Sequence, residues 1–273
     1  MASKKRGAAF RVASWNINSA RLRIALIEKF LQQAKPDVLC LQETKSPVEK
    51  LPIDRLAAAG YPHFAARGEP GYNGVLIISR WPLEDRSSVD FCGKGDARHV
   101  AAEIAPPEAE PFTIDNVYVP AGGDVPDRAE NEKFGHKLDF VDEMAERLAP
   151  LAQRRIVLGD LNIAPLECDV WSHKQLLKVV SHTPIEVEKF DAARLAGGWI
   201  DSLRAVIPAP DKVYSWWSYR ARDWEASDRG RRLDHIWLSP DLGGALGGAG
   251  VLKAARGWEQ PSDHAPIWVD LTL

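Results

Sequence analysis

The sequence predicts an α/β fold in which one domain contains many β-strands. Short apolar or β-rich runs recur along the 273-residue chain, and each is bounded by Gly, Pro, Asn or Asp. Segments with helical spacing of apolar residues lie between some of these runs. Hydrophobic residues make up 45% of the chain, enough for a substantial core. Because no long polar linker and no fixed-period repeat interrupts the pattern, we expect a single domain.

The first elements are a strand, a helix and a second strand. "FRVASWNI", residues 10–17, and "DVLCLQE", residues 37–43, are expected to be buried strands. Between them, residues 25–34 carry apolar side chains at helical spacing, and a proline follows. These side chains are Leu26, Ile27, Phe30 and Leu31.

Most of the remaining apolar runs are also expected to be strands. They are "NGVLIIS", "RHVAAEIA", "FTIDNVYV", "RRIVLGDLN", "RLDHIWLS" and "APIWVDLTL". The clearest helix lies between the third and fourth of these runs, where one apolar face should cover a sheet. That face comprises Phe134, Leu138, Val141, Ala145 and Leu148. The stretch "LGGALGGAG", residues 242–250, lacks the Lys-Ser/Thr of a phosphate-binding loop and is expected to be a flexible connector.

Composition narrows the possible classes of protein. The net charge of -3 argues against a protein that coats nucleic acid generally, although a local basic face is compatible with it. The three cysteines are scattered, which argues against a disulfide framework or a zinc site. No apolar run is long enough to span a membrane, and no signal peptide is recognisable, so a cytoplasmic protein is expected. Residues 1–8 should form a short flexible basic N-terminus before a domain of residues 9–273.

Carboxylates and amides stand at the ends of several predicted strands. Asn16 and Asn18 follow the first strand, Glu43 ends the second, and Asp160 and Asn162 end a later one. Residues i and i+2 of a strand face the same side, so each pair can point at one site. Each residue taken singly could be a turn former. Together, oxygen ligands without thiolates suit a hard ion such as Mg²⁺.

The segment "QPSDHAPIW" places Asp263 beside His264. Adjacent residues in an extended segment point to opposite faces, so Asp263 is poorly placed to bond the imidazole of its neighbour. Asp234 lies inside an apolar strand, where an unpaired carboxylate would be costly, and it is the predicted partner of His264. That hydrogen bond would raise the pKa of His264 and favour an imidazolium that can meet a phosphate.

Aromatic and basic residues alternate in "YSWWSYRARDWEASDRGRRLD". Rings that stack or wedge, interleaved with guanidinium groups, suit a nucleic-acid surface. A solvated loop with several core tryptophans is the alternative, because acidic residues partly offset the charge.

These residues resemble the exonuclease III family of apurinic/apyrimidinic endonucleases, within the endonuclease/exonuclease/phosphatase superfamily. The matching stretches are "SWNINSAR", "LCLQETK", "GYNGVLIISR", "NVYVPAGG", "VLGDLNIAP", "YSWWSYRARDWEASDRGRRLDHIWLS" and "PSDHAPIW". They follow the family's order and span nearly the whole chain. The resemblance implies a four-layer α/β sandwich of the DNase I-like type, in which two packed mixed β-sheets are flanked by helices.

The same resemblance implies a DNA repair enzyme. Its reaction would be Mg²⁺-dependent hydrolysis of the phosphodiester 5′ to an abasic site, with Mn²⁺ as a possible substitute. It would leave a 3′-hydroxyl and a 5′-deoxyribose phosphate. Additional 3′→5′ exonuclease and 3′-phosphatase or phosphodiesterase activities are implied. The expected partner is double-stranded DNA with abasic or 3′-blocked sites; no membrane is involved, and a monomer is expected.

The resemblance also assigns roles to individual residues. Glu43 matches the principal metal ligand, with Asn18 and Asp263 near the metal. Asp160 matches the residue that activates water, and Asn162 matches the amide that orients it. The phosphate-site residues would be Asn16, Tyr118, Asp234 and His264, with Tyr118 assisting the leaving group. The DNA-contacting residues would be Asn73, Trp216, Arg220, Arg231 and Leu233.

Three positions depart from the pattern of some members. Asn18 replaces an acidic residue of the animal enzymes, and Ala121 lacks a side-chain amide that many relatives carry. Arg231 stands where animal members have a tryptophan that lines the abasic pocket, leaving Trp216 and Leu233 as the apolar wall. These changes concern the balance of endonuclease and exonuclease activities rather than the chemistry.

Two rival interpretations remain. Another superfamily enzyme, such as a DNase I-like nuclease or a sphingomyelin or inositol-phosphate phosphodiesterase, usually carries a second catalytic histidine where this chain has Tyr118. A DNA-binding relative that has lost catalysis would lack Glu43, Asp160 or His264, and all three are present.

Overall fold

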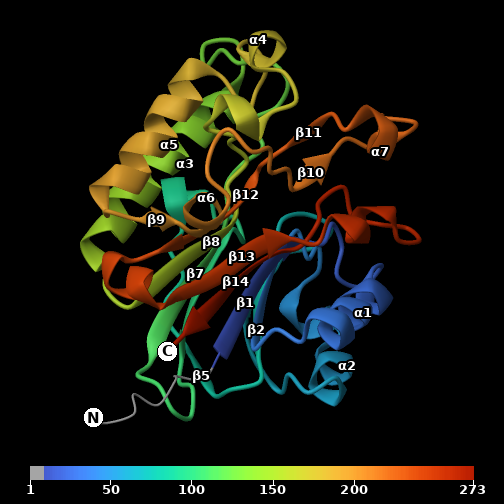
Figure 1. Cartoon of the computed structure of the whole chain (residues 1–273), viewed down its shortest axis with the longest axis vertical. Coiled ribbons are helices and arrows are strands. Elements are labelled where there is room, and N and C mark those ends of the chain that lie inside the picture. The colour runs from blue at the N-terminus through green and yellow to red at the C-terminus, as the bar shows by residue number, and fades with distance from the viewer. Residues whose placement is uncertain (1–8) are drawn as a thin grey trace.

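Two six-stranded mixed β-sheets pack face to face in the computed structural model, which describes residues 9–273 (Figure 1). The strand order of the first sheet is β13-β14-β1-β2-β4-β3. Strands β1 and β2 are parallel, so their carboxyl ends meet at the same edge. The bounds are β1 Ala9–Asn16, β2 Val38–Gln42, β3 His63–Arg67, β4 Val75–Ser79, β13 Leu246–Val251 and β14 Ile267–Thr272.

The second sheet has the strand order β5-β6-β7-β8-β12-β9. Here β7 and β8 form the parallel pair, and β12 runs antiparallel beside β8. The bounds are β5 Leu83–Asp85, β6 His99–Ile104, β7 Phe112–Tyr118, β8 Arg155–Asp160, β9 Ile200–Asp201 and β12 Asp234–Leu238. A separate two-stranded ribbon consists of β10, Trp216–Trp217, and β11, Gly230–Arg231.

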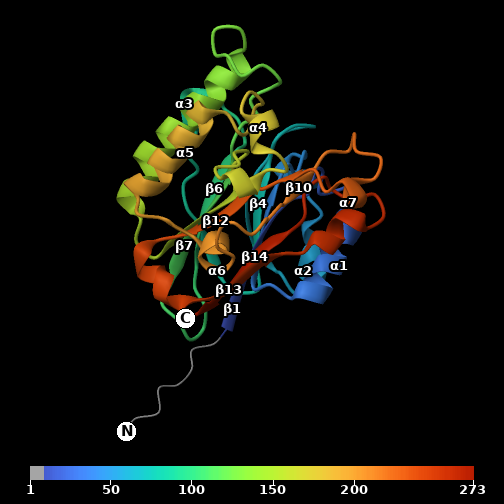
Figure 2. The ribbon, with the colours of Figure 1, turned by 45° about the horizontal axis from the view of Figure 1, so that its top comes forward.

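Helices cover the outer faces of both sheets, which makes four layers. Figures 1 and 2 show α3 and α5 side by side on one side of the molecule, with α1 and α2 on the other. Residues of both sheets form one buried cluster between them, and a second buried cluster joins the first sheet to α1 and α2. A third joins the second sheet to α3 and α5. The bounds are α1 Ile24–Ala34, α2 Ile53–Ala58, α3 Glu132–Leu148, α4 His173–Leu176, α5 Pro184–Ala196, α6 Ser202–Val206 and α7 Trp224–Ser227.

The predicted fold class is confirmed, and the two predicted helices correspond to α1 and α3. The sequence analysis did not identify α5, although its start carries a local signal. Pro184 occupies the first turn, and the Thr183 and Glu186 side chains form a capping box with the backbone. The prediction of a flexible N-terminus concerns residues 1–8, which lie outside the described residues. Among residues 9–273, no helix is long and apolar enough to cross a membrane.

The prediction of a flexible connector at "LGGALGGAG" is wrong. Residues Leu246–Val251 form β13, an edge strand that pairs with β14 after a short helical turn. One glycine of this strand allows a side chain to pack directly against the backbone. A Cβ atom at Gly250 would lie 2.9 Å from the ring of Trp268 on the neighbouring strand, so the absence of a side chain lets that ring lie against the backbone.

A buried histidine in β12 should make the stability of the fold pH-dependent. His235 Nε2 donates to the carbonyl of Ile163 at 2.8 Å, and Nδ1 accepts from Arg232 at 3.1 Å, so the ring is neutral. Burial and the Arg232 charge lower the pKa of His235 to about 4. The unfolded chain binds a proton at higher pH than the folded one, so stability falls on acidification below about pH 6.5.

We expect the free energy of unfolding to drop by about 2 kcal/mol from pH 7 to pH 5 because of this group. Urea unfolding of the wild type and of His235→Gln at several pH values measures the difference. A variant with the wild-type pH slope would show that another group is responsible.

Candidate active site

The site forms where strands from both sheets end together. Asn16 is the last residue of β1 and pairs in register with Gln42 of β2, so Glu43 follows at the same edge. In the second sheet, Asp160 lies opposite both Tyr118 and Asp234 in the strand register. The strand-end pattern therefore brings together residues that lie far apart in the sequence.

Asn16 connects two of the carboxylates. Its Nδ2 donates to Glu43 Oε1 and to Asp160 Oδ2, both at 2.9 Å. The Tyr118 hydroxyl donates to the same Glu43 oxygen at 2.8 Å. Asn18 lies next to this network, and its backbone N–H donates to Asn16 Oδ1 at 3.1 Å.

His264 and Asp234 form the predicted pair. The imidazole Nδ1 lies 2.8 Å from Asp234 Oδ2, and Nε2 lies 3.7 Å from Asp160 Oδ2. Burial disfavours the charged ring, but the carboxylates of Asp234 and Asp160 outweigh it and raise the pKa of His264 to about 10. The Asp263 carboxylate bonds other partners than the His264 ring. It accepts from Trp216 Nε1 at 3.0 Å and from Asn18 Nδ2 at 3.4 Å.

The carboxylates of Asp160 and Glu43 have different electrostatic surroundings. Burial raises the pKa of Asp160 to about 7, with Asp234 and Glu43 adding to the effect and His264 opposing it. Burial acts in the same direction on Glu43, but hydrogen bonds from Asn16 and Lys45 outweigh it and lower the pKa. Glu43 is therefore ionised at neutral pH, while Asp160 can gain or lose a proton there.

A lysine shows where a cation fits. The Lys45 ammonium lies 2.8 Å from Glu43 Oε2 and 2.6 Å from Asn18 Oδ1, so it occupies a position between two predicted metal ligands. Two oxygens converging on one cation are the kind of donor that a hard divalent ion uses. Asp160, Asp234 and His264 also present ligand atoms within 4.8 Å of one another, and a hydrogen bond joins His264 Nδ1 to Asp234 Oδ2 within this group.

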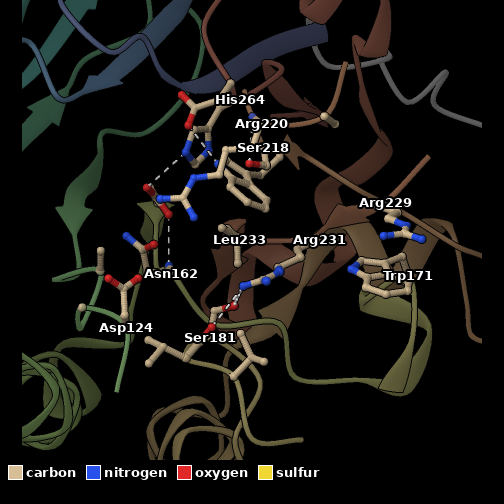
Figure 3. Close-up of a pocket in the computed structure, with 18 of the residues that line it drawn as sticks. Asp124, Asn162, Trp171, Ser181, Ser218, Arg220, Arg229, Arg231, Leu233 and His264 are labelled. Atoms are coloured by element: carbon tan, nitrogen blue, oxygen red, sulfur yellow. Dashed lines mark hydrogen bonds and ion pairs between the residues drawn. The ribbon is translucent and has the colours of Figure 1, made fainter. Parts of the chain in front are cut away.

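The strand ends open into a cavity of about 700 Å³. Figure 3 shows His264 and Asn162 on one side of it, Trp171 and Arg229 on the other, and Leu233 and Arg231 between them. The Arg231 guanidinium lies 5.2 Å from the centre of the Trp216 ring, and Nη1 donates to Ser181 Oγ at 2.8 Å. The cavity thus joins an end lined by carboxylates and His264 to an apolar and basic end.

Four of the five predicted DNA-contacting residues line this cavity. They are Trp216, Arg220, Arg231 and Leu233. Asn73 does not: it is only 1% exposed, its side chain donates to Glu69, and its carbonyl accepts from Lys45 N–H at 2.9 Å. The structure therefore does not bring Asn73 to the cavity, and its contact with DNA stays a prediction.

Part of the cavity wall was not among the predicted site residues. The Arg229 guanidinium lies 4.7 Å from the centre of the Trp171 ring, and residues 179–181 complete the same wall. Arg229 lies in the aromatic and basic segment quoted above, but no local pattern marks Trp171 or residues 179–181, because they come from loops that only the fold brings together. Lys45 stands within the quoted motif "LCLQETK", so its position was a signal that the sequence analysis did not use.

The defining pattern of the Endonuclease/Exonuclease/phosphatase family matches residues 13–264. The chain belongs to this family. It is 31% identical to the DNA repair nuclease APEX1 of Danio rerio over 98% of this chain and 84% of that protein. It is 29% identical to exodeoxyribonuclease III of Haemophilus influenzae over 94% of this chain and 98% of that one.

Solved structures agree with this family membership. An AP endonuclease from Archaeoglobus fulgidus superposes with a TM-score of 0.89 at 29% identity, covering 97% of this chain and 100% of that chain. The 3′-5′ exonuclease NExo from Neisseria meningitidis superposes with a TM-score of 0.87 at 29% identity and the same coverage. The resemblance to the exonuclease III family is therefore confirmed, as is the expectation that this family member is a nuclease-type enzyme.

Proposed function

We propose that this protein is an Mg²⁺-dependent AP endonuclease that hydrolyses the DNA backbone 5′ to an abasic site. The observation that carries the proposal is the convergence of Asp160, Glu43 and the His264–Asp234 pair at one end of a cavity with aromatic and basic walls. The products would be a 3′-hydroxyl and a 5′-deoxyribose phosphate. The names of the relatives, which are DNA repair nucleases and exodeoxyribonucleases, support this substrate class.

Glu43, Asn18 and Asp263 are the proposed ligands of the cation, Mg²⁺ or in substitution Mn²⁺. The position of the Lys45 ammonium supports the first two, and Asp263 Oδ1 lies 3.4 Å from Asn18 Nδ2. When bound, a divalent ion would neutralise charge on the non-bridging phosphate oxygens. Asn18 contributes no negative charge, so the site relies on Glu43 and Asp263 for electrostatic attraction.

Asp160 is the proposed general base for the attacking water. A base works best when its pKa lies near the working pH, and burial raises the pKa of Asp160 to about 7. Asn16 Nδ2 holds one carboxylate oxygen, and the Asn162 N–H holds the other at 3.0 Å. The Asn162 side chain lines the cavity and donates one amide hydrogen to Val119 O at 2.9 Å, which leaves the second for water or phosphate.

His264 and Tyr118 are proposed to act on the phosphate. An imidazolium held by Asp234 can donate Nε2–H to a phosphate oxygen as negative charge develops there. Burial and nearby carboxylates raise the pKa of the Tyr118 hydroxyl well above its usual value, so it remains a proton donor next to the site. We propose that it assists departure of the 3′-oxygen.

The basic and apolar walls are proposed to bind double-stranded DNA. Trp216 and Leu233 would contact the extruded abasic sugar, and Arg220 and Arg231 would contact phosphates. Arg231 Nη1 donates to Val180 O and to Ser181 Oγ, both of which are uncharged, so the charge of Arg231 is available to an anionic ligand. We propose that residues 9–273 act as one catalytic domain in a monomer.

Two further activities are included in the proposal. The likeness to NExo, named as a 3′-5′ exonuclease and a 3′ phosphatase, favours 3′→5′ exonuclease and 3′-phosphatase or phosphodiesterase activity on 3′-blocked ends. A lipid or inositol-phosphate phosphodiesterase is disfavoured, because the reported relatives are DNA nucleases. The presence of Glu43, Asp160 and His264 disfavours an inactive relative.

The deciding experiment uses a duplex oligonucleotide that contains one tetrahydrofuran abasic analogue. Incision 5′ to the analogue is expected with Mg²⁺ and not with EDTA, and the matched undamaged duplex is the control. Hydrolysis of a lipid or inositol phosphate with no incision of the lesion would contradict the proposal.

Glu43→Gln is expected to raise the Mg²⁺ concentration for half-maximal incision by at least about tenfold, because it removes a charged ligand. Titration of Mg²⁺ against the incision rate measures the change. Glu49→Gln is the control, since Glu49 is an exposed carboxylate in the turn that follows the motif. Equal Mg²⁺ dependence in wild type and Glu43→Gln would remove Glu43 from the ligand set.

Arg220→Gln is expected to reduce the slope of log Kd against log salt concentration by about 1, because one phosphate contact is lost. Fluorescence anisotropy with a labelled abasic duplex in Ca²⁺ or EDTA measures binding without turnover. Arg55→Gln is the control, because Arg55 is exposed, pairs with Glu28 and lies on α2 in the opposite layer. An unchanged slope would show that Arg220 does not contact a phosphate.

A further inference from the structure

A buried ion pair lies behind the cavity wall, between the two helices that cover the second sheet. Lys137 of α3 and Glu186 of α5 are both 0% exposed, and Lys137 Nζ lies 2.5 Å from Glu186 Oε1. Figure 1 shows that α3 and α5 run side by side. Neither side chain lines the cavity, so neither belongs to the site described above.

Lys137 holds two loops that end in the cavity. Its ammonium donates to the carbonyl of Asn162 at 2.8 Å and to the carbonyl of Ala121 at 3.3 Å. These loops follow β8 and β7, the parallel strands that carry Asp160 and Tyr118. Asn162 has a φ of 54°, a left-handed conformation that a non-glycine residue adopts only when its surroundings hold it there.

Glu186 holds a third loop. Its carboxylate accepts from the N–H of Ser181 at 2.9 Å, from the N–H of Thr183 at 3.1 Å and from the Thr183 hydroxyl at 2.7 Å. The same loop holds Arg231, whose Nη1 donates to Ser181 Oγ at 2.8 Å and to Val180 O at 3.1 Å. Each member of the ion pair thus directs its remaining hydrogen bonds to loops of the cavity.

We propose that Lys137 and Glu186 are positioning residues that fix three walls of the active-site cavity relative to one another. The inference rests on the proposed function, because it concerns the same site. A buried ion pair contributes little net stability compared with apolar residues of similar size, so stability alone does not account for its charges. The contacts with the loops account for the charges. The Lys137 ammonium sets the spacing of the Ala121 and Asn162 carbonyls. The Glu186 carboxylate fixes the backbone at Ser181, whose side chain binds Arg231.

The test compares Lys137→Met, Glu186→Gln and the double variant. Each single change leaves a buried charge without its partner, so the double variant, which removes both charges and keeps similar volumes, is the informative one. Its kcat on the abasic duplex is expected to fall roughly 100-fold, the effect of a small misplacement of catalytic groups, with a smaller change in KM. Asp115→Asn is the matched control and should keep the wild-type kcat, since it neutralises an equally buried carboxylate between His99 and Arg155.

A second readout separates this inference from the proposed function. The Ala164 N–H donates to Ser181 O at 2.8 Å and touches neither charged group, so its hydrogen-exchange rate reports whether the loops remain joined. Faster exchange at Ala164 is expected in the double variant and not in Asp115→Asn. A folded double variant with wild-type kcat would overturn the inference. If the wild type itself fails to incise the abasic duplex, the proposed function is wrong, and unchanged Ala164 exchange would then overturn the positioning role.

Discussion

Asp160→Asn is expected to lower kcat for incision of an abasic duplex by roughly 10³-fold while leaving DNA binding largely intact. Asparagine has nearly the same shape as aspartate, but it has a single acceptor oxygen. Asn16 and the Asn162 N–H now donate to the two different carboxylate oxygens at 2.9 and 3.0 Å, so the variant can keep only one of these hydrogen bonds. The amide cannot take a proton from water. The substitution therefore removes the base, keeps the size of the side chain and loses one hydrogen bond.

Stability should change in the opposite direction to activity. Burial raises the pKa of Asp160 from 3.8 to about 7, so stability falls as the pH rises between these two values, and the full cost of the ionised carboxylate is present above about pH 7. In EDTA at pH 8, Asp160→Asn is therefore expected to be more stable than the wild type.

Single-turnover incision, anisotropy binding and urea unfolding measure the three quantities for this variant. Asp115→Asn is again the control for neutralising a buried carboxylate outside the cavity. A wild-type rate in Asp160→Asn would show that another group activates the water.

His264→Asn is expected to lower kcat by about 10²- to 10³-fold, the usual effect of removing one preorganised donor from a site of developing negative charge. The shorter amide cannot replace an imidazolium that reaches past Asp234 toward the Asp160 side of the cavity, where Nε2 lies 3.7 Å from Asp160 Oδ2. Asp234→Asn should reduce kcat less, because the ring remains but loses the carboxylate 2.8 Å from Nδ1 that favours its charged form.

The double variant His264→Asn/Asp234→Asn distinguishes a working pair from two separate contributions. If Asp234 acts only through His264, the double variant should be no slower than His264→Asn alone. Additive losses in kcat would show that Asp234 has its own role at the phosphate. Unfolding measurements on the same variants exclude loss of structure as the cause.

Much of the site could be predicted from the sequence because it depends on local pattern. The alternation and length of apolar runs identified the strands. Glu43, Asp160 and Asn162 were identified as site residues because they stand at the ends of these strands. The partner of His264 could be inferred because Asp234 stands in an apolar strand where an unpaired carboxylate is unfavourable. The distance of 2.8 Å between these side chains confirms that inference.

Other features depended on how the layers pack. Asn73 stands in a family motif, yet the fold buries it in a turn. The second half of "LGGALGGAG" lies in a strand, where Gly250 leaves room for the ring of Trp268. Trp171 and Arg229 come from separate loops and lie against each other on one side of the cavity.

The fold class, most of the strands and the chemical groups of the candidate site could therefore be predicted from the amino-acid pattern alone. Local periodicity specifies which face of an element is buried, and a residue type specifies what chemistry it can perform. Which groups lie against one another depends on how the layers pack. The contact between Lys137 and Glu186 is the clearest case, because it requires two helices to lie side by side on one sheet, and no spacing within either helix encodes that neighbour.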